Sequence, residues 1–180
     1  MTNDNIIGID LGGTHVRAGV VREGNLKDIV SSRIPASGTV EEVLQVIYNL
    51  VDPLMNEQVK AIGIGVPSVV DIEKGIVYDV QNIPSWKEVA LKKLMEARYN
   101  RPVLINNDAN CFALGEKYFG KGKNFSSMIG LTIGTGLGAG IIINDKLYAG
   151  VNCGAGEFGC VEYRDQYFEY YASGQFFENC

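Results

Sequence analysis

The sequence lacks the features that mark several common classes of protein. It has one histidine and four cysteines. The cysteines, at Cys111, Cys153, Cys160 and Cys180, have no CxxC spacing and no histidine at a zinc-ligand distance. We interpret them as reduced thiols of a cytoplasmic protein. No apolar run approaches the roughly 20 residues of a membrane helix, and the opening MTNDN is too polar for a secretory signal. We therefore expect no membrane association.

Positive charge is also scarce. The 16 Lys and Arg residues are outnumbered by 21 Asp and Glu residues, and the formal net charge is −5 at pH 7. No basic cluster of the kind that grips a phosphate backbone occurs, so we expect no nucleic-acid partner. With 46% apolar and 21% charged residues, the composition is typical of a globular protein.

Glycine, by contrast, is abundant, at 22 of 180 residues where average usage is about 7%. Much of it lies in two similar stretches, NIIGIDLGGTHVRAGVV (5–21) and SMIGLTIGTGLGAGIII (127–143). A shift of 122 residues, from Ile6 to Met128, places Gly8 on Gly130. With one residue deleted, Gly19 falls on Gly140. Each stretch has the pattern of a hairpin, two Ile- and Val-rich strands joined by a glycine turn.

This repeat predicts two similar α/β lobes, over residues 1–122 and 123–180. From the start of its opening strand at Met128, the second lobe has only residues 128–180. A lobe of this kind needs helices on its sheet and further strands. We infer that the chain is an incomplete version of a two-lobe protein, or that a partner completes it.

The intervening residues predict alternating strands and helices. Strands are expected at 28–36, 59–67 and 101–106, the last two apolar on both faces as in parallel sheets. Thr39 and Glu42 have the spacing of a capping box that opens a helix ending or kinking at Pro53. Three more helices are expected: one opened by a second box at Ser85 and Glu88, one beginning at Asp108, and one near 167–178.

Glycine turns suit the binding of phosphate, because amides can face an anion with no Cβ in the way. Thr14 and Thr135 add hydroxyl donors, so a nucleoside triphosphate is the expected ligand. Asp10 could hold Mg²⁺ directly or through its waters, or it could stabilise the hairpin as a turn residue. A carboxylate ending an apolar strand is costly without a partner, which favours the metal.

Four ordered motifs, IIGIDLGGTHVR, NDANCFALGE, LTIGTGLGAG and GAGEFG, together resemble the ROK family of bacterial sugar kinases and sugar-responsive repressors. The resemblance implies an α/β, actin-like (hexokinase-type, ribonuclease H-like) ATPase fold. It implies a complete N-terminal lobe plus the start of the second lobe.

The resemblance also implies roles for individual residues. Asp108 matches the catalytic base; its alternative role is that of a helix N-cap. Positions that match the ATP phosphate contacts are Asp10, Gly12, Gly13, Thr14, Gly134, Thr135, Gly136 and Gly138. Positions that match sugar contacts are Asn82, Asn107, Asp108, Glu157 and Glu169. Turn and cap roles are the alternative for the sugar-contacting side chains.

Three departures from the family pattern matter. His15 stands where the family's GGTK motif has lysine, so that phosphate contact is lost. Cys160 stands where the GExGH motif has histidine, and too few residues separate Cys160 from Glu169 to hold the family's zinc loop, so we expect no zinc. Family members are also longer, and their later part carries much of the adenosine pocket.

These observations predict a cytoplasmic, homodimeric kinase that uses ATP and Mg²⁺ to phosphorylate a hydroxyl of a hexose, either glucose-like or an N-acetylhexosamine. One alternative is a sugar-sensing repressor of the same family. Only five residues precede Ile6, so we expect no DNA-binding domain. The other alternative is a non-catalytic protein that binds sugar but no nucleotide.

Overall fold

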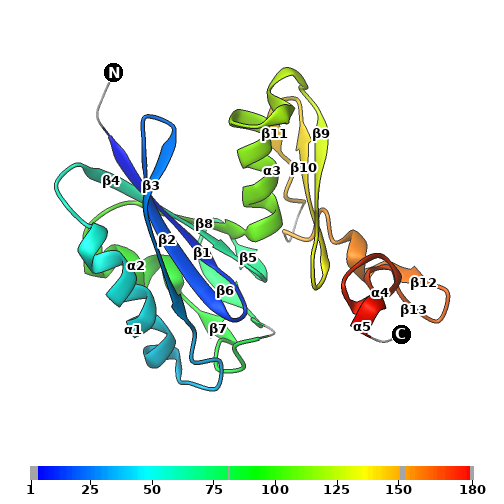
Figure 1. Ribbon diagram of the computed structural model, residues 1–180, viewed down its shortest axis with the longest axis horizontal. Coiled ribbons are helices and arrows are strands. Elements are labelled where there is room, and N and C mark those ends of the chain that lie inside the picture. The colour runs from blue at the N-terminus through cyan, green and yellow to red at the C-terminus, as the bar shows by residue number, and fades with distance from the viewer. Residues whose placement is uncertain (1–3, 81, 151–152, 179–180) are drawn as a thin grey trace. The chain divides into compact units, whose positions relative to one another are not determined.

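The computed structural model describes residues 4–80, 82–150 and 153–178. Contacts within the chain divide it into two compact units, Met1–Asp108 and Ala109–Cys180. The predicted lobe boundary at residue 122 stays a prediction. Figure 1 colours the first unit from blue to green and the second from green to red.

A five-stranded sheet forms the first unit, in the order β3-β2-β1-β4-β8. Strands β1 (Asn5–Leu11), β2 (His15–Arg22) and β3 (Asn25–Arg33) form an antiparallel meander, as the glycine hairpin predicted. Strands β4 (Val59–Val66) and β8 (Val103–Asn107) run parallel to β1. The parallel strands end at one edge of the sheet, because parallel strands share a direction.

Helix α1 (Val40–Val51) begins with the predicted capping box. The amide of Glu42 donates to Thr39 Oγ1 at 3.2 Å, and the Thr39 amide donates to Glu42 Oε2 at 2.8 Å. The helix ends at Val51, and a 3-10 turn, η1 (Asp52–Leu54), contains Pro53. Its buried Val43 and Ile47 belong to the same core as Ile7 of β1.

Thr39→Ala is expected to lower the free energy of unfolding by about 1 kcal/mol, because the Glu42 amide loses its acceptor. Urea denaturation followed by circular dichroism measures this change. Thr39→Ser keeps the hydroxyl and should lose only a few tenths of that amount. An equal loss in both variants would show that the hydroxyl does not cap α1.

Strand β8 is buried on one face, not on both as predicted. In β8, Val103 and Ile105 are buried while Leu104 between them is 70% exposed. Ile6 of β1 is likewise 45% exposed. The described elements of this unit bury one face of the sheet, and the alternation of side chains leaves the other face open.

The predicted capping box at Ser85 and Glu88 is wrong. Glu88 lies in strand β7 (Glu88–Val89), and helix α2 (Leu91–Tyr99) begins after it with no side-chain cap. Strand β7 pairs with β6 (Ile76–Tyr78), which pairs with β5 (Val69–Asp71). Trp86 is fully buried. Burial of this segment overrides the local cap signal.

The second unit repeats the opening hairpin. Strands β9 (Met128–Ile133), β10 (Leu137–Ile143) and β11 (Lys146–Leu147) form a sheet in the order β11-β10-β9. Gly8 pairs with Gly19 in the first hairpin, and Gly130 pairs with Gly140 in the second. The predicted deletion lies in the turn, because Leu11 pairs with Val16 but Ile133 pairs with Leu137. The sequence repeat is therefore a structural one.

The matching strands of the two hairpins differ in burial. On β1, three apolar side chains are at most 4% exposed: Ile7, Ile9 and Leu11. On β9, the residues that the repeat aligns with them are 50–67% exposed: Ile129, Leu131 and Ile133. Ile7 of β1 shares its core with Val43 and Ile47 of α1, whereas the exposed side chains of β9 have no such cover within the described part of the chain.

Helix α3 (Asp108–Tyr118) packs on the opposite face of the second hairpin, where Gly138 and Gly140 leave room for its alanines. After β11, short elements follow: η3 (Phe158–Cys160), β12 (Glu162–Tyr163) and β13 (Gln166–Tyr167). The helix predicted near 167–178 is two short helices, α4 (Phe168–Ala172) and α5 (Gln175–Glu178). No helix among the described residues is long and apolar enough to cross a membrane.

Candidate functional site

The carboxyl edge of the first sheet gathers several of the predicted residues. Register pairs Asp10 with Gly65, and Gly65 in turn with Asn106. With neighbouring strands about 4.8 Å apart, Asp10 and Asn106 are on the order of 10 Å apart across β4. The first glycine turn follows β1 at this edge, and Asp108 follows β8.

The first glycine turn, residues 12–15, is closed by a hydrogen bond from the Gly12 amide to the His15 carbonyl at 2.9 Å. The Ile34 amide donates to the Thr14 carbonyl, also at 2.9 Å. Asn82 lies directly against this turn, since a Cβ built on Gly13 would be 2.3 Å from Asn82 Nδ2. A predicted sugar contact therefore touches a predicted phosphate contact.

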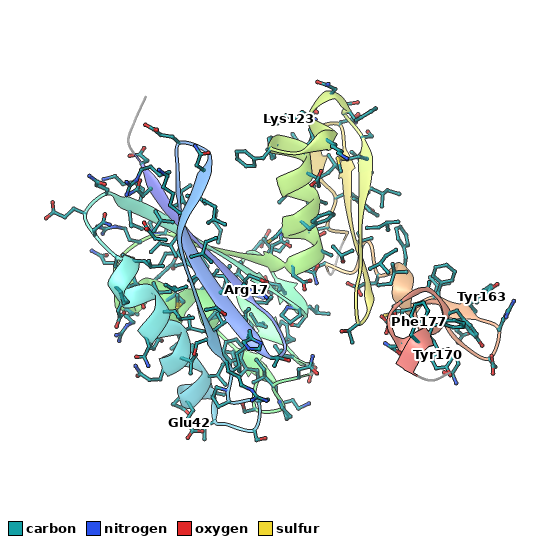
Figure 2. The ribbon with its side chains drawn as sticks, viewed as in Figure 1. Arg17, Glu42, Lys123, Tyr163, Tyr170 and Phe177 are labelled. Atoms are coloured by element: carbon teal, nitrogen blue, oxygen red, sulfur yellow. The ribbon has the colours of Figure 1, made fainter. Side chains whose placement is uncertain are left out.

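Asp10 is more exposed than the sequence argument assumed. Its carboxylate is 57% exposed and lies 3.5 Å from the Arg17 guanidinium, the residue opposite it in the hairpin. Figure 2 labels Arg17 on β2. The expected cost of burying an unpaired carboxylate is therefore absent, and that part of the argument for a metal is wrong. An exposed pair of this kind is weak.

Asn107 and Asp108 stand where β8 passes directly into α3. The Asn107 amide donates to Asn106 Oδ1 at 2.9 Å, and Asn107 Nδ2 donates to the Ser68 carbonyl at 3.4 Å. Asp108 is the first residue of α3, as predicted, and is exposed. A helix N-terminus stabilises a negative charge, and the rigid strand and helix fix the position of the carboxylate.

The second glycine turn, Gly134 to Gly136, is closed by a hydrogen bond from the Gly134 amide to the Gly136 carbonyl at 3.0 Å. Gly138 lies beyond the turn, in β10, where a Cβ would be 2.9 Å from the Ala109 Cβ. Its predicted role in phosphate binding is untested, and this close contact gives it a packing role.

Glu169 lies beside the second turn. Its Oε2 accepts a hydrogen bond from the Leu137 amide at 3.2 Å, and a Cβ built on Gly159 would be 3.1 Å from the same atom. Glu157 precedes η3, and the Cys160 thiol lies 4.0 Å from its carboxylate. The second unit thus brings together its turn, Glu169 and η3. Their predicted contacts with sugar stay predictions.

Burial, and then the charges of Glu157 and Glu169, raise the pKa of the Cys160 thiol. Less thiolate is present at a given pH, so iodoacetamide should label Cys160 more slowly in the folded protein than in urea at pH 8. Peptide mass spectrometry measures the rate. Glu157→Gln should speed labelling, whereas Glu162→Gln should not, because Glu157 is one of the charges that raise this pKa and Glu162 is not among them. Equal rates in the two variants would contradict this.

The sequence argument missed several residues that contact the predicted site residues or the two turns: Arg17, Ile34, Ser68, Ser173 and Gly174. Hairpin register could have placed Arg17 opposite Asp10. No sequence pattern indicated a role for Ser173 or Gly174, which lie where the helix predicted near 167–178 divides into α4 and α5. A cavity of about 420 Å³ lies beside these two residues, with Phe177 and Gly134 also in its wall. Figure 2 labels Phe177 and Tyr170 in this C-terminal region.

Among the described residues, no group of three or more His, Cys, Asp or Glu side chains could hold a metal ion. The expected absence of zinc stays a prediction. Asp10 offers a single exposed carboxylate at the end of β1. That donor fits Mg²⁺ that keeps most of its waters and also binds substrate phosphates.

The strand order of the first unit and the repeated hairpin of the second define the class of protein: an α/β chain with the actin-like, hexokinase-type ATPase fold. The family model described as "ROK family" matches residues 6–173. The chain belongs to the ROK family.

Relatives within and beyond the kinases resemble this chain. A glucokinase of Streptomyces coelicolor is 41% identical over 155 residues, which are 85% of this chain and 48% of the relative. A xylose repressor of Caldicellulosiruptor bescii is 37% identical over 86% of this chain and 40% of the relative. A ROK family glucokinase from Streptomyces griseus, solved in complex with glucose and AMPPNP, superposes with a TM-score of 0.84. It is 37% identical, over 95% of this chain and 58% of that chain. The chain spans about half the length of the curated relatives it matches.

Proposed function

We propose that this chain provides the sugar-binding and phosphate-binding part of an ATP-dependent hexose kinase. The observation that carries the proposal is the edge of the first sheet, where Asn82 lies against the first glycine turn and Asp108 follows β8. A kinase needs the sugar hydroxyl, a base and the phosphates close together. The kinase relatives support the same activity.

In the proposed reaction, Asp108 accepts the proton of a sugar hydroxyl as the hydroxyl oxygen attacks the γ-phosphorus. The bond from that phosphorus to the bridging β–γ oxygen breaks, and ADP leaves. Asn82, Asn107, Glu157 and Glu169 hydrogen-bond the other hydroxyls, since amides and carboxylates together donate and accept. Amides of the turns at Gly12–Thr14 and Gly134–Gly136 bind the phosphates. Mg²⁺ held by Asp10 through its waters would neutralise phosphate charge.

The proposed substrate is a hexose, glucose-like or an N-acetylhexosamine, and the proposed setting is a cytoplasmic homodimer. The xylose repressor relative supports a second candidate, a sugar-binding protein without catalysis. The replacement of the family's lysine by His15 favours that candidate as well. Both functions use the same sugar contacts, so sugar binding alone does not separate them.

A coupled assay of ADP release, run with glucose, N-acetylglucosamine and xylose, tests the proposal. The kinase predicts ADP release that requires Mg²⁺ and one of the hexoses. Sugar binding by titration calorimetry with no ADP release would support the non-catalytic candidate. ADP release at equal rates with and without sugar would contradict both.

A further inference from the structure

Three hydrogen bonds tie the second glycine turn to the segment that carries α4 and α5. Ser173 Oγ donates to the Thr135 carbonyl at 3.0 Å, and the Gly174 amide donates to the Gly134 carbonyl at 2.7 Å. The Leu137 amide donates to Glu169 Oε2 at 3.2 Å. Ser173 is only 4% exposed, so its hydroxyl is committed to this contact rather than to water.

In this turn the carbonyls take part in hydrogen bonds, whereas two of the amides do not within the part of the chain that the structure describes. The carbonyls of Gly134, Thr135 and Gly136 all accept hydrogen bonds, from Gly174, Ser173 and Gly134 respectively. The amides of Thr135 and Gly136 have no acceptor within the described ranges. A phosphate oxygen needs amide donors and is repelled by carbonyl oxygens. Fixing the carbonyls therefore leaves the two amides available to an anion.

The first turn is held in a similar way by different means. There the Ile34 amide, immediately after β3, donates to the Thr14 carbonyl at 2.9 Å. The corresponding tie in the second turn comes from a side chain far along the chain. The two hairpins thus fix the equivalent turn carbonyls, of Thr14 and Thr135, with unrelated donors. This recurrence indicates that the orientation of the turn carbonyl is important for the turn's role.

We infer that Ser173 is a positioning residue for the second phosphate turn. It touches no phosphate itself. It holds the Thr135 carbonyl so that the amides of Thr135 and Gly136 face the polyphosphate of a nucleoside triphosphate. This inference rests on the proposed kinase function and deepens it, because it assigns part of the nucleotide affinity to a residue outside the turn.

Ser173→Ala in the purified protein tests the inference. The KM for MgATP should rise about tenfold, since the Thr135 carbonyl loses its donor and the turn loses its geometry. The KM for the sugar should stay within about twofold, because the sugar contacts proposed in the first unit are untouched and Glu169 keeps its own hydrogen bond from the Leu137 amide. Ser173→Thr keeps the hydroxyl and should restore most of the affinity for MgATP. Titration with MgATP and with sugar separately gives the same comparison without turnover.

Ser85→Ala is the matched control, because the buried Ser85 hydroxyl has no hydrogen-bond partner in the described part of the chain. It should leave both KM values unchanged. A Ser173→Ala variant that binds MgATP like the unmodified protein overturns the inference. So does one in which affinities for MgATP and sugar fall together and Ser173→Thr rescues neither. Failure of the unmodified protein to bind MgATP would instead overturn the kinase proposal.

Discussion

Asp108→Asn is expected to lower kcat by a factor of about 10²–10⁴, the usual contribution of a general base. Affinity for the sugar should change by no more than about twofold. The amide matches the carboxylate in size and is accepted at a helix start, so α3 should begin as before. It cannot take the proton from the attacking hydroxyl. ADP release gives kcat, and titration calorimetry with glucose gives the affinity.

Asp79→Asn is a suitable control for this variant. Asp79 is an exposed aspartate that pairs with Lys87 at 3.3 Å, and its φ of 46° is one that asparagine also adopts readily. Its loss should leave kcat unchanged. If Asp108→Asn keeps most of the rate, Asp108 is not the base. If rate and sugar affinity fall by the same factor, its role is to bind sugar.

The parts of the fold that sequence could predict are those fixed by local patterns. The sequence repeat predicted both glycine hairpins, because side-chain alternation and turn residues mark strand pairing. Thr39 and Glu42 cap α1 as expected, since each partner lies three residues from the other. Asp108 opens α3 because a buried strand there gives way to a helical pattern.

The parts that sequence could not predict depend on distant contacts. Ser85 and Glu88 have the same spacing as Thr39 and Glu42, yet the buried Trp86 and the pairing of β7 with β6 take that segment into a different structure. Asp10 was expected to need a metal as its partner at the end of an apolar strand, but its carboxylate is exposed and lies beside Arg17.

The candidate site was predictable only in part for the same reason. The family resemblance named Asn82, and no local pattern indicated that it would lie against Gly13. Ser173 was not predicted at all, since its acceptor, the Thr135 carbonyl, lies 38 residues earlier. Such contacts become visible only when the chain is folded.

Gly140→Ala is expected to destabilise the second unit by about 1–3 kcal/mol. A Cβ at Gly140 would lie 2.5 Å from the Ala113 Cβ and 2.8 Å from the Ala109 carbonyl oxygen. Helix α3 must then move away from the hairpin, and its backbone cannot yield as a flexible side chain could. Thermal unfolding followed by circular dichroism measures the loss, and amide hydrogen exchange in α3 locates it.

Gly8→Ala in the first hairpin is a suitable control, since a Cβ at Gly8 meets no atom within 4 Å. Where the native backbone accepts it, glycine to alanine stabilises a protein by about 0.4–1 kcal/mol, because the unfolded chain has less freedom. The two substitutions should therefore have opposite signs, although they occupy equivalent hairpins. Equal effects would mean that the glycines of β10 are needed for the backbone conformation of the strand and not for its packing against α3. Opposite effects would mean that the glycines of β10 are needed for the close approach of α3. Because α3 begins at Asp108, packing at Gly140 and the placement of the proposed base would then depend on the same helix.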